Sequence, residues 1–107
     1  MQNRKLIGLV LIGAVIMLIG ACGGEGASSS QQSLAEGQSV FQQYCVVCHG
    51  RDGKMQANGA KDLTLSQMPL KDRVALIKSG KNLMASFNGI LSPDQIDAAA
   101  KYTMTFK

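Results

Sequence analysis

The sequence predicts an all-α fold with three main helices and long loops. Three observations support this class. Apolar and small residues recur at steps of three and four over residues 34–48 and 96–106, as on one face of a helix. No segment shows a convincing strand pattern, and 107 residues suit one small domain rather than two. This length excludes a TIM barrel, a two-domain Rossmann enzyme and a polytopic membrane protein.

The first 22 residues have the pattern of an export leader. Arg4 and Lys5 precede the apolar run Leu6–Ile19, which is the order found in secretory signal peptides. The run continues into Leu-Ile-Gly-Ala-Cys, which resembles the lipobox of bacterial lipoproteins, with Cys22 as the residue that accepts the lipid. We therefore expect residues 1–21 to be removed. The mature chain is then exported, anchored to a membrane by acyl chains on Cys22, and faces the periplasm or the cell exterior.

An uncleaved membrane helix is the alternative interpretation of this leader. The segment Leu6–Cys22 has 17 residues, which is the lower limit for spanning a bilayer. Three glycines interrupt it, and the small residues before Cys22 favour cleavage. Both interpretations place the rest of the chain outside the cytoplasm.

A segment rich in Gly, Ser and Gln separates the leader from the domain. Residues 22–33 predict a flexible tether, and residues 34–107 predict the folded domain. With Arg4 and Lys5 assigned to the leader, the remainder carries nine basic and seven acidic residues, a net charge of +2. That charge is too small for a nucleic-acid surface, which needs a dense basic stripe, so we expect no nucleic-acid partner.

The first two helices are predicted from the spacing of apolar residues. One runs from about Ser33 to Tyr44 and delivers a pair of cysteines at its C-terminal end. Residues 50–65 contain three glycines and no periodicity, so we expect a loop there. A second helix around Leu70–Ile77 is expected to end near Gly80, because glycine is common just after a helix C-terminus.

The third helix has the clearest start signal. Ser92 is suited to cap its N-terminus, Pro93 to occupy its first position and Gln95 to complete a capping box. It is expected to run to about Phe106. Its two apolar faces consist of Ile96, Ala99, Ala100 and Thr103, and of Ala98, Tyr102 and Phe106.

The pentapeptide Cys45-Val46-Val47-Cys48-His49 carries the strongest chemical signal. C-x-x-C-H is the attachment signature of c-type haem. Each thiol forms a thioether with one haem vinyl group, and two intervening residues span the distance between the vinyls. The adjacent histidine is then placed to bind the iron. We predict one covalent haem c held by Cys45 and Cys48, with His49 as an axial iron ligand.

Three other uses of these residues compete with haem attachment. A zinc site needs about four ligands, but after Cys22 the chain offers two cysteines and one histidine. A thioredoxin-like redox pair needs a βαβ context, which the sequence lacks. A disulfide between Cys45 and Cys48 stays open, although it leaves His49 without a role.

With this pentapeptide after a first helix and a capped C-terminal helix, residues 34–107 resemble the class I monohaem cytochromes c. The small bacterial and algal electron carriers are the closest match in length. The resemblance implies the cytochrome c fold, with helices and loops wrapped around the haem. It also implies that Gly37 and Phe41 of the first helix cross the last helix near Tyr102.

The resemblance identifies Ile77–Phe87 as the segment that carries the sixth iron ligand, and Met84 as that ligand. Met84 follows His49 by 35 residues and precedes the last helix, an order that lets it approach the opposite haem face. Met68 competes because Pro69 follows it, as Pro often follows the ligand in this family. Met55 is too near His49, and Met104 is expected in the core.

The loop after His49 departs from the family pattern. The family usually has a proline there, whose carbonyl accepts a hydrogen bond from the proximal imidazole, but none occurs between Gly50 and Met68. We expect a carbonyl within Met55–Gly59 to take that role, because a metal-binding histidine normally has such an acceptor.

The predicted function is one-electron transfer, not enzymatic catalysis. His49 and Met84 together fill both axial positions of the iron and leave none for a substrate. We expect a monomer that docks transiently with redox proteins while its lipid holds it at a membrane. The alternatives are a haem enzyme or gas sensor with an open sixth position, and a structural lipoprotein without haem.

Overall fold

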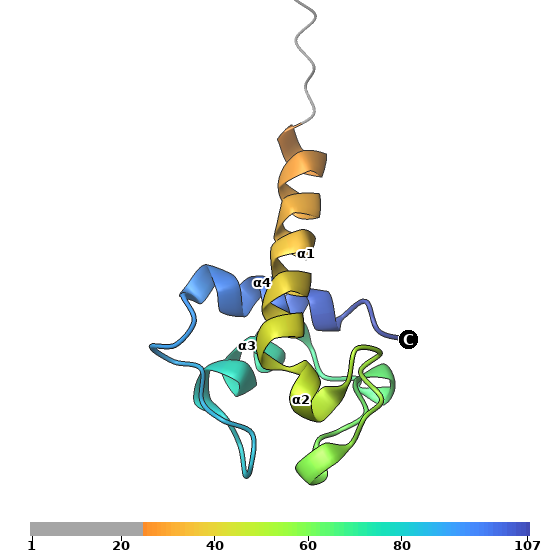
Figure 1. Cartoon of the computed structure of the whole chain (residues 1–107). Helices are drawn as coiled ribbons and strands as arrows, with labels where there is room; N and C mark the ends of the chain where they lie inside the picture. Colours follow the sequence, from red (N-terminus) through yellow and green to blue (C-terminus); the bar gives the residue numbers. More distant parts are fainter. Residues whose placement is uncertain (1–24) are drawn as a thin grey trace, which may run out of the picture.

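The computed structural model describes residues 25–107, with side chains from Ser29 onward, and it is helical as predicted (Figure 1). No strand occurs within these residues, which contain two isolated bridges between loop residues. The predicted leader and Cys22 lie outside the described residues. In chain order, the elements are α1 Glu25–Tyr44, α2 Val46–His49, the 3-10 turns η1 Ala57–Gly59 and η2 Leu63–Leu65, α3 Leu70–Ser79 and α4 Pro93–Thr103.

The crossing of α1 over α4 organises the fold (Figure 1). Gly37 is buried at this crossing, where a Cβ atom would overlap the Ala98 carbonyl oxygen. The Phe41 ring lies 5.4 Å from the Tyr102 ring, centroid to centroid, and 5.1 Å from that of Phe106. The structure therefore confirms the predicted roles of Gly37, Phe41 and Tyr102 in close helix packing.

Replacing Gly37 with alanine tests this crossing. We expect Gly37→Ala to lower the free energy of unfolding by about 3 kcal/mol, at the upper end of overpacking effects, because backbone atoms of α4 must move. Denaturant unfolding followed by circular dichroism measures the change. The exposed neighbour Gln38 gives the matched control, since Gln38→Ala should shift stability by less than about 0.5 kcal/mol. Equal stability of the two variants would contradict the packing described.

The hydrophobic core lies between α1, α3 and α4 and is small. Phe41 is the one large side chain among the described residues that is fully buried. One predicted face of α4 enters the buried cluster, while Tyr102 and Phe106 of the other predicted face pack on the Phe41 ring. The buried cluster consists of Val40, Ile77, Leu91, Ile96, Ala99 and Ala100.

The start of α4 is the capping box that the sequence predicts. The Ser92 hydroxyl accepts a hydrogen bond from the Gln95 N–H, and the Gln95 side chain accepts one from the Ser92 N–H, at 3.2 and 3.0 Å. The helix ends at Thr103 rather than near Phe106, because the Met104 N–H already bonds the Lys101 carbonyl in a tighter turn. Met104 is consequently exposed, and its predicted place in the core is wrong.

Arg73 of α3 joins three segments of the chain. Its guanidinium is buried and donates to the carbonyls of Ser66, Met68 and Thr103 at 2.9–3.0 Å. Burial lowers the pKa of Arg73 from its ordinary value, and the group keeps its charge at neutral pH. The bonds hold the loop before α3 against the C-terminal end of α4, where carbonyl oxygens favour a positive charge.

The first helix is longer than predicted. It begins at Glu25 rather than near Ser33, so residues 25–33 are helical where the sequence predicted a flexible tether. Packing of residues from Gly37 onward provides the nucleus of this helix, and each residue added before it gains one hydrogen bond. Within residues 25–107 no helix combines the length and the hydropathy needed to cross a bilayer.

Candidate functional site

The residues of the pentapeptide are held on one helical turn. The Cys45 N–H donates to the Phe41 carbonyl at 2.9 Å, so the chain continues almost directly from α1 into α2. The His49 N–H then donates to the Cys45 carbonyl at 2.9 Å. Cys45 and Cys48 are three residues apart, and residues with that spacing lie on one helix face. The structure thus presents both thiols and the imidazole together.

Both thiols are free rather than joined in a disulfide. Burial raises the pKa of the Cys45 thiol to about 11. Across residues 25–107 no cluster of three or more His, Cys, Asp or Glu side chains is arranged to hold a metal ion. The geometry therefore favours neither the zinc site nor the disulfide as a role for this turn.

The imidazole of His49 has its hydrogen-bond acceptor in the following loop. Its Nδ1 lies 3.2 Å from the carbonyl oxygen of Lys61. Donation from Nδ1 leaves the Nε2 lone pair available for a metal. The expectation of an acceptor within Met55–Gly59 is wrong, because that stretch turns back through η1 and the chain reaches the ring two residues later.

Two sets of hydrogen bonds in the residues that follow Lys61 fix the backbone and so the position of its carbonyl. The Asp62 carboxylate accepts from both the N–H and the hydroxyl of Thr64, at 2.9 and 2.6 Å, and this hydrogen bonding lowers the pKa of Asp62. The Leu63 N–H donates to the Gly53 carbonyl at 2.8 Å, which closes the loop. Asp-x-Thr before a short helical turn is a local signal for such a cap. The carbonyl role of Lys61, by contrast, has no side-chain signature in the sequence.

Met84 lies in a tight turn after α3. The N–H of Lys81 donates to the Met84 carbonyl at 3.0 Å, and the N–H of Met84 donates back to the Lys81 carbonyl at 2.9 Å. Gly80 enters this turn with φ +70°, where a Cβ would meet the Met84 carbonyl oxygen. The Met84 side chain is half-buried and packs against the core cluster.

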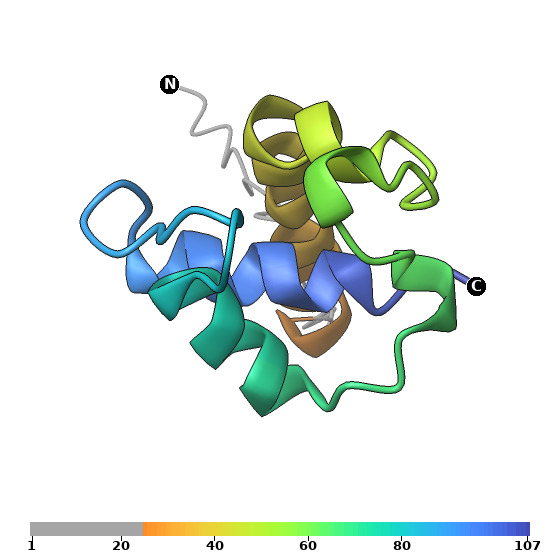
Figure 2. The ribbon, with the colours of Figure 1, turned by 90° about the horizontal axis from the view of Figure 1, so that it is seen from below.

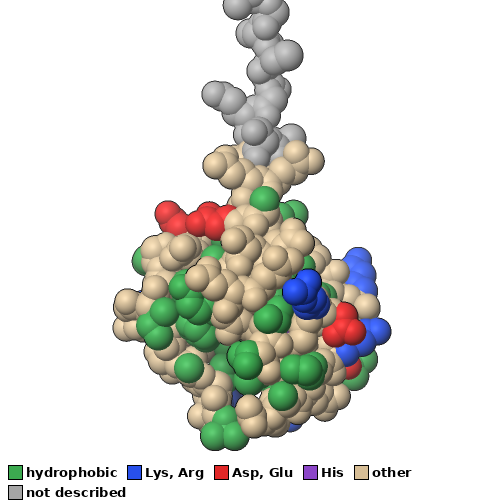
Figure 3. All heavy atoms as spheres, in the orientation of Figure 1, with side chains coloured by type: hydrophobic (Ala, Val, Ile, Leu, Met, Phe, Trp, Pro, Cys, Tyr) green, Lys and Arg blue, Asp and Glu red, His purple; other side chains and the backbone are tan. Residues whose placement is uncertain are grey.

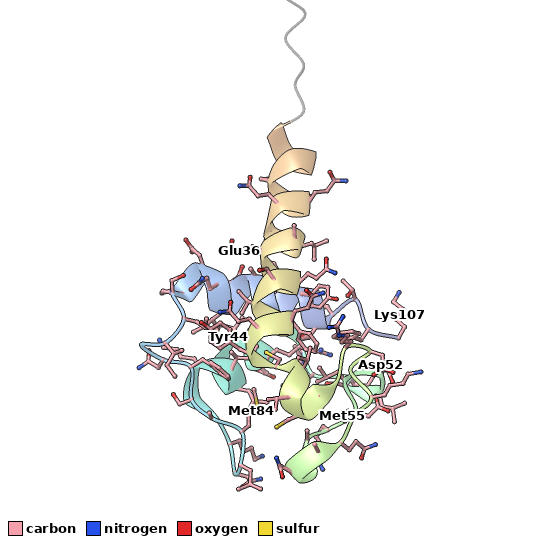
Figure 4. All side chains as sticks on the ribbon, viewed as in Figure 1. Glu36, Tyr44, Asp52, Met55, Met84 and Lys107 are labelled. Atoms are coloured by element: carbon pink, nitrogen blue, oxygen red, sulfur yellow. The ribbon has the colours of Figure 1, made fainter. Side chains whose placement is uncertain are left out.

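Phe87 brings the Met84 loop to the pentapeptide. Its N–H donates to the Ile77 carbonyl at 3.1 Å, and its ring meets the Tyr44 ring edge-on at a centroid distance of 6.0 Å. Tyr44 directly precedes Cys45. Figure 4 shows Met84 on the loop beside α2 and Met55 on the loop on the other side of α2.

Met68 is tied to the end of α4 rather than to the pentapeptide. Its carbonyl accepts the Arg73 Nε–H at 3.0 Å, and Arg73 also bonds Thr103 at the end of α4. In the view of Figure 2, α4 lies between α2 and the segment that joins η2 to α3. The structure therefore brings Met84, and not Met68, towards the turn that carries His49.

These features suit a covalently held haem c. The turn presents two thiols on one face and an imidazole whose Nε2 is unengaged, while a thioether lies on the facing loop. The Asn58 amide is 3.8 Å from the Cys48 sulfur, so η1 also closes over this turn. Met55 and Leu83, from the loops that follow α2 and α3, are exposed apolar side chains that offer surface to a bound porphyrin.

Comparison with known proteins identifies the family. Residues 32–102, more than half of the chain, match the family described as cytochrome C oxidase, cbb3-type, subunit III. The chain belongs to the cytochrome c family. This cytochrome c is 37% identical over 76 residues to cytochrome c6 of Leptolyngbya boryana, covering 65% of the chain and 88% of the relative. It is 40% identical over 82 residues to cytochrome c6 of Limnospira maxima, covering 66% and 90%.

A shorter match extends the set of relatives. This cytochrome c is 34% identical over 58 residues to cytochrome c-551 of Bacillus subtilis, covering 46% of the chain and 52% of the relative. Family membership confirms the predicted all-α cytochrome c fold and the single covalent haem c. It also confirms an electron-transfer protein rather than an enzyme.

Proposed function

We propose that this cytochrome c is an exported one-electron carrier, held at a membrane by a lipid on Cys22. Cys45 and Cys48 carry the haem, and His49 and Met84 bind its iron on opposite faces. The observation that supports this most strongly is the hydrogen bond from His49 Nδ1 to the Lys61 carbonyl, because it fixes the imidazole with Nε2 free.

The protein controls the iron through its two axial side chains. A c-type haem supplies reversible one-electron chemistry at its iron. His49 is oriented by Lys61, whereas Met84 offers a soft thioether that favours reduced iron and raises the reduction potential. With His49 and Met84 both holding the iron, no coordination position would be left for a substrate or a gas. His49 is the chain's only histidine, so a second imidazole ligand from the same chain is excluded.

Absorption spectra of the purified, exported protein test this assignment. A carrier shows a low-spin, covalent c-type spectrum with the weak far-red band of methionine bound to ferric iron. A high-spin ferric spectrum with ready binding of cyanide or carbon monoxide would support the enzyme or gas sensor instead. Transient docking with redox proteins follows from the exposed turn around Val47, and the carrier is expected to be a monomer.

The lipid anchor makes a separate prediction. Cys22→Ser removes the thiol that accepts the lipid, so the exported variant should leave the membrane fraction almost completely while keeping its haem. Cell fractionation with haem staining measures both properties at once. Membrane retention of the variant together with a parent protein that carries no acyl group on Cys22 by mass spectrometry would make the leader an uncleaved helix and the lipid assignment wrong.

A further inference from the structure

The N-terminal part of α1 contributes little to the core. Residues 29–32 and 34–36 are exposed, whereas Gly37, Val40 and Phe41 are buried where α1 meets α4. Figure 1 shows the first turns of α1 projecting beyond the body of the domain, on the side opposite α2. The packed half of the helix fixes the direction in which the exposed half points.

The length of α1 sets the distance between its first residue and the haem-binding turn. From Glu25 to Tyr44 it has 20 residues, which at 1.5 Å per residue correspond to about 30 Å. The Cys45 N–H bonds the Phe41 carbonyl, so the haem-binding turn follows α1 without a hinge. The pentapeptide is therefore held about 30 Å from the start of the helix.

The start of the helix is close to the proposed lipid. Two residues, Gly23 and Gly24, separate Cys22 from Glu25 in the sequence. Three residue steps reach at most about 10 Å even when fully extended. If Cys22 carries the lipid, as proposed above, α1 begins near the membrane surface and the haem-binding turn is at its far end.

The shape of the domain disfavours a strong tilt of α1 towards the membrane surface. In Figure 1, α4 extends to both sides of α1, so tilting α1 would press the body against the bilayer. Figure 3 shows acidic side chains gathered on the shoulder of the body beside the projecting helix. Glu36 and Asp94 are both exposed, and carboxylates of this kind are repelled by anionic headgroups.

We infer that residues 25–36 of α1 are a rigid spacer that holds the haem-binding turn away from the membrane. Electron-transfer rates fall steeply with the distance between donor and acceptor, so a haem held above the membrane exchanges electrons fastest with a centre at the same height. The partner is a redox centre in a protein domain that rises above the bilayer, not a quinol dissolved in the lipid. The inference rests on the proposed lipid anchor.

The test uses the complete, lipid-carrying, haem-loaded protein in anionic vesicles that contain a headgroup fluorophore and ubiquinol. Gln32→Pro breaks the helix within its exposed part, and Gln32→Ala is the matched control. Energy transfer from the fluorophore to the haem and the rate of haem reduction by ubiquinol should both rise severalfold in Gln32→Pro. Gln32→Ala should behave like the parent protein, and all three should keep the same haem spectrum.

The outcomes separate the spacer from the anchor. Vesicle flotation shows whether the protein is bound to lipid. Failure to float overturns the anchor and this inference together. Flotation with equal energy transfer and equal quinol reduction in all three proteins overturns the rigid spacer but leaves the anchored electron carrier intact.

Discussion

Alanine in place of both Cys45 and Cys48 should leave the exported chain without covalent haem and largely unfolded. The core explains the second effect, because Phe41 is its one large, fully buried side chain among the described residues. A core of this size rarely supplies more than about 3–5 kcal/mol, and the proposed haem would be the additional apolar centre on which the loops pack. Mass spectrometry measures the attachment, and circular dichroism measures the helix content.

The third cysteine provides the control for that experiment. Cys22→Ser also removes one thiol, yet it lies outside the domain and should leave both haem content and helicity unchanged. If the variant lacking Cys45 and Cys48 retained a covalent haem, the attachment proposed for this turn would be wrong. Full helicity without haem would instead show that the small core is sufficient for folding.

Met84→Ala should change the absorption spectrum and the reduction potential of the haem iron more than any other methionine substitution. Loss of the thioether removes the far-red band and opens a coordination position to carbon monoxide and cyanide. The reduction potential should fall by on the order of 0.1 V, part of the roughly 0.8 V range that axial ligands control. Spectroelectrochemistry of the purified protein measures the band and the potential together.

Met68→Ala is the matched control for the iron ligand. Met68 is half-buried like Met84, but its backbone is tied to Arg73 beside the end of α4. Its replacement should cost some stability and leave the far-red band and potential unchanged. Loss of the band in Met68→Ala, with Met84→Ala unaffected, would transfer the ligand role to Met68.

Local signals made much of the fold predictable. The Ser92–Gln95 capping box and the glycine after α3 each depend on a few adjacent residues, whereas the glycine at the helix crossing was predicted from the family resemblance. Dependence on local signals also explains why the predicted start of α1, near Ser33, differs from the observed start at Glu25. Ser- and Gln-rich residues do not form a helix strongly by themselves, and here they continue one that is nucleated by Val40 and Phe41.

The site was predictable to the extent that its chemistry resides in side chains. The pentapeptide predicts the thiols and the imidazole as the groups that bind haem, because their identities and spacing carry the chemistry. The acceptor for His49 is a backbone carbonyl, which any residue provides, so its position depends on the path of the loop through η1 to Lys61. Met84 as the sixth ligand stays a prediction from the sequence, and the paths of the two loops support it over Met68.

Extraction of the purified mature protein with acidified organic solvent tests the central claim most directly. Thioether bonds survive this treatment, whereas haem that is held only by axial ligands and packing is released. We expect the colour to remain with the polypeptide, whose mass should include one haem in addition to the chain and its lipid. Colour in the organic phase, or a colourless protein from the outset, would contradict the proposed attachment through Cys45 and Cys48.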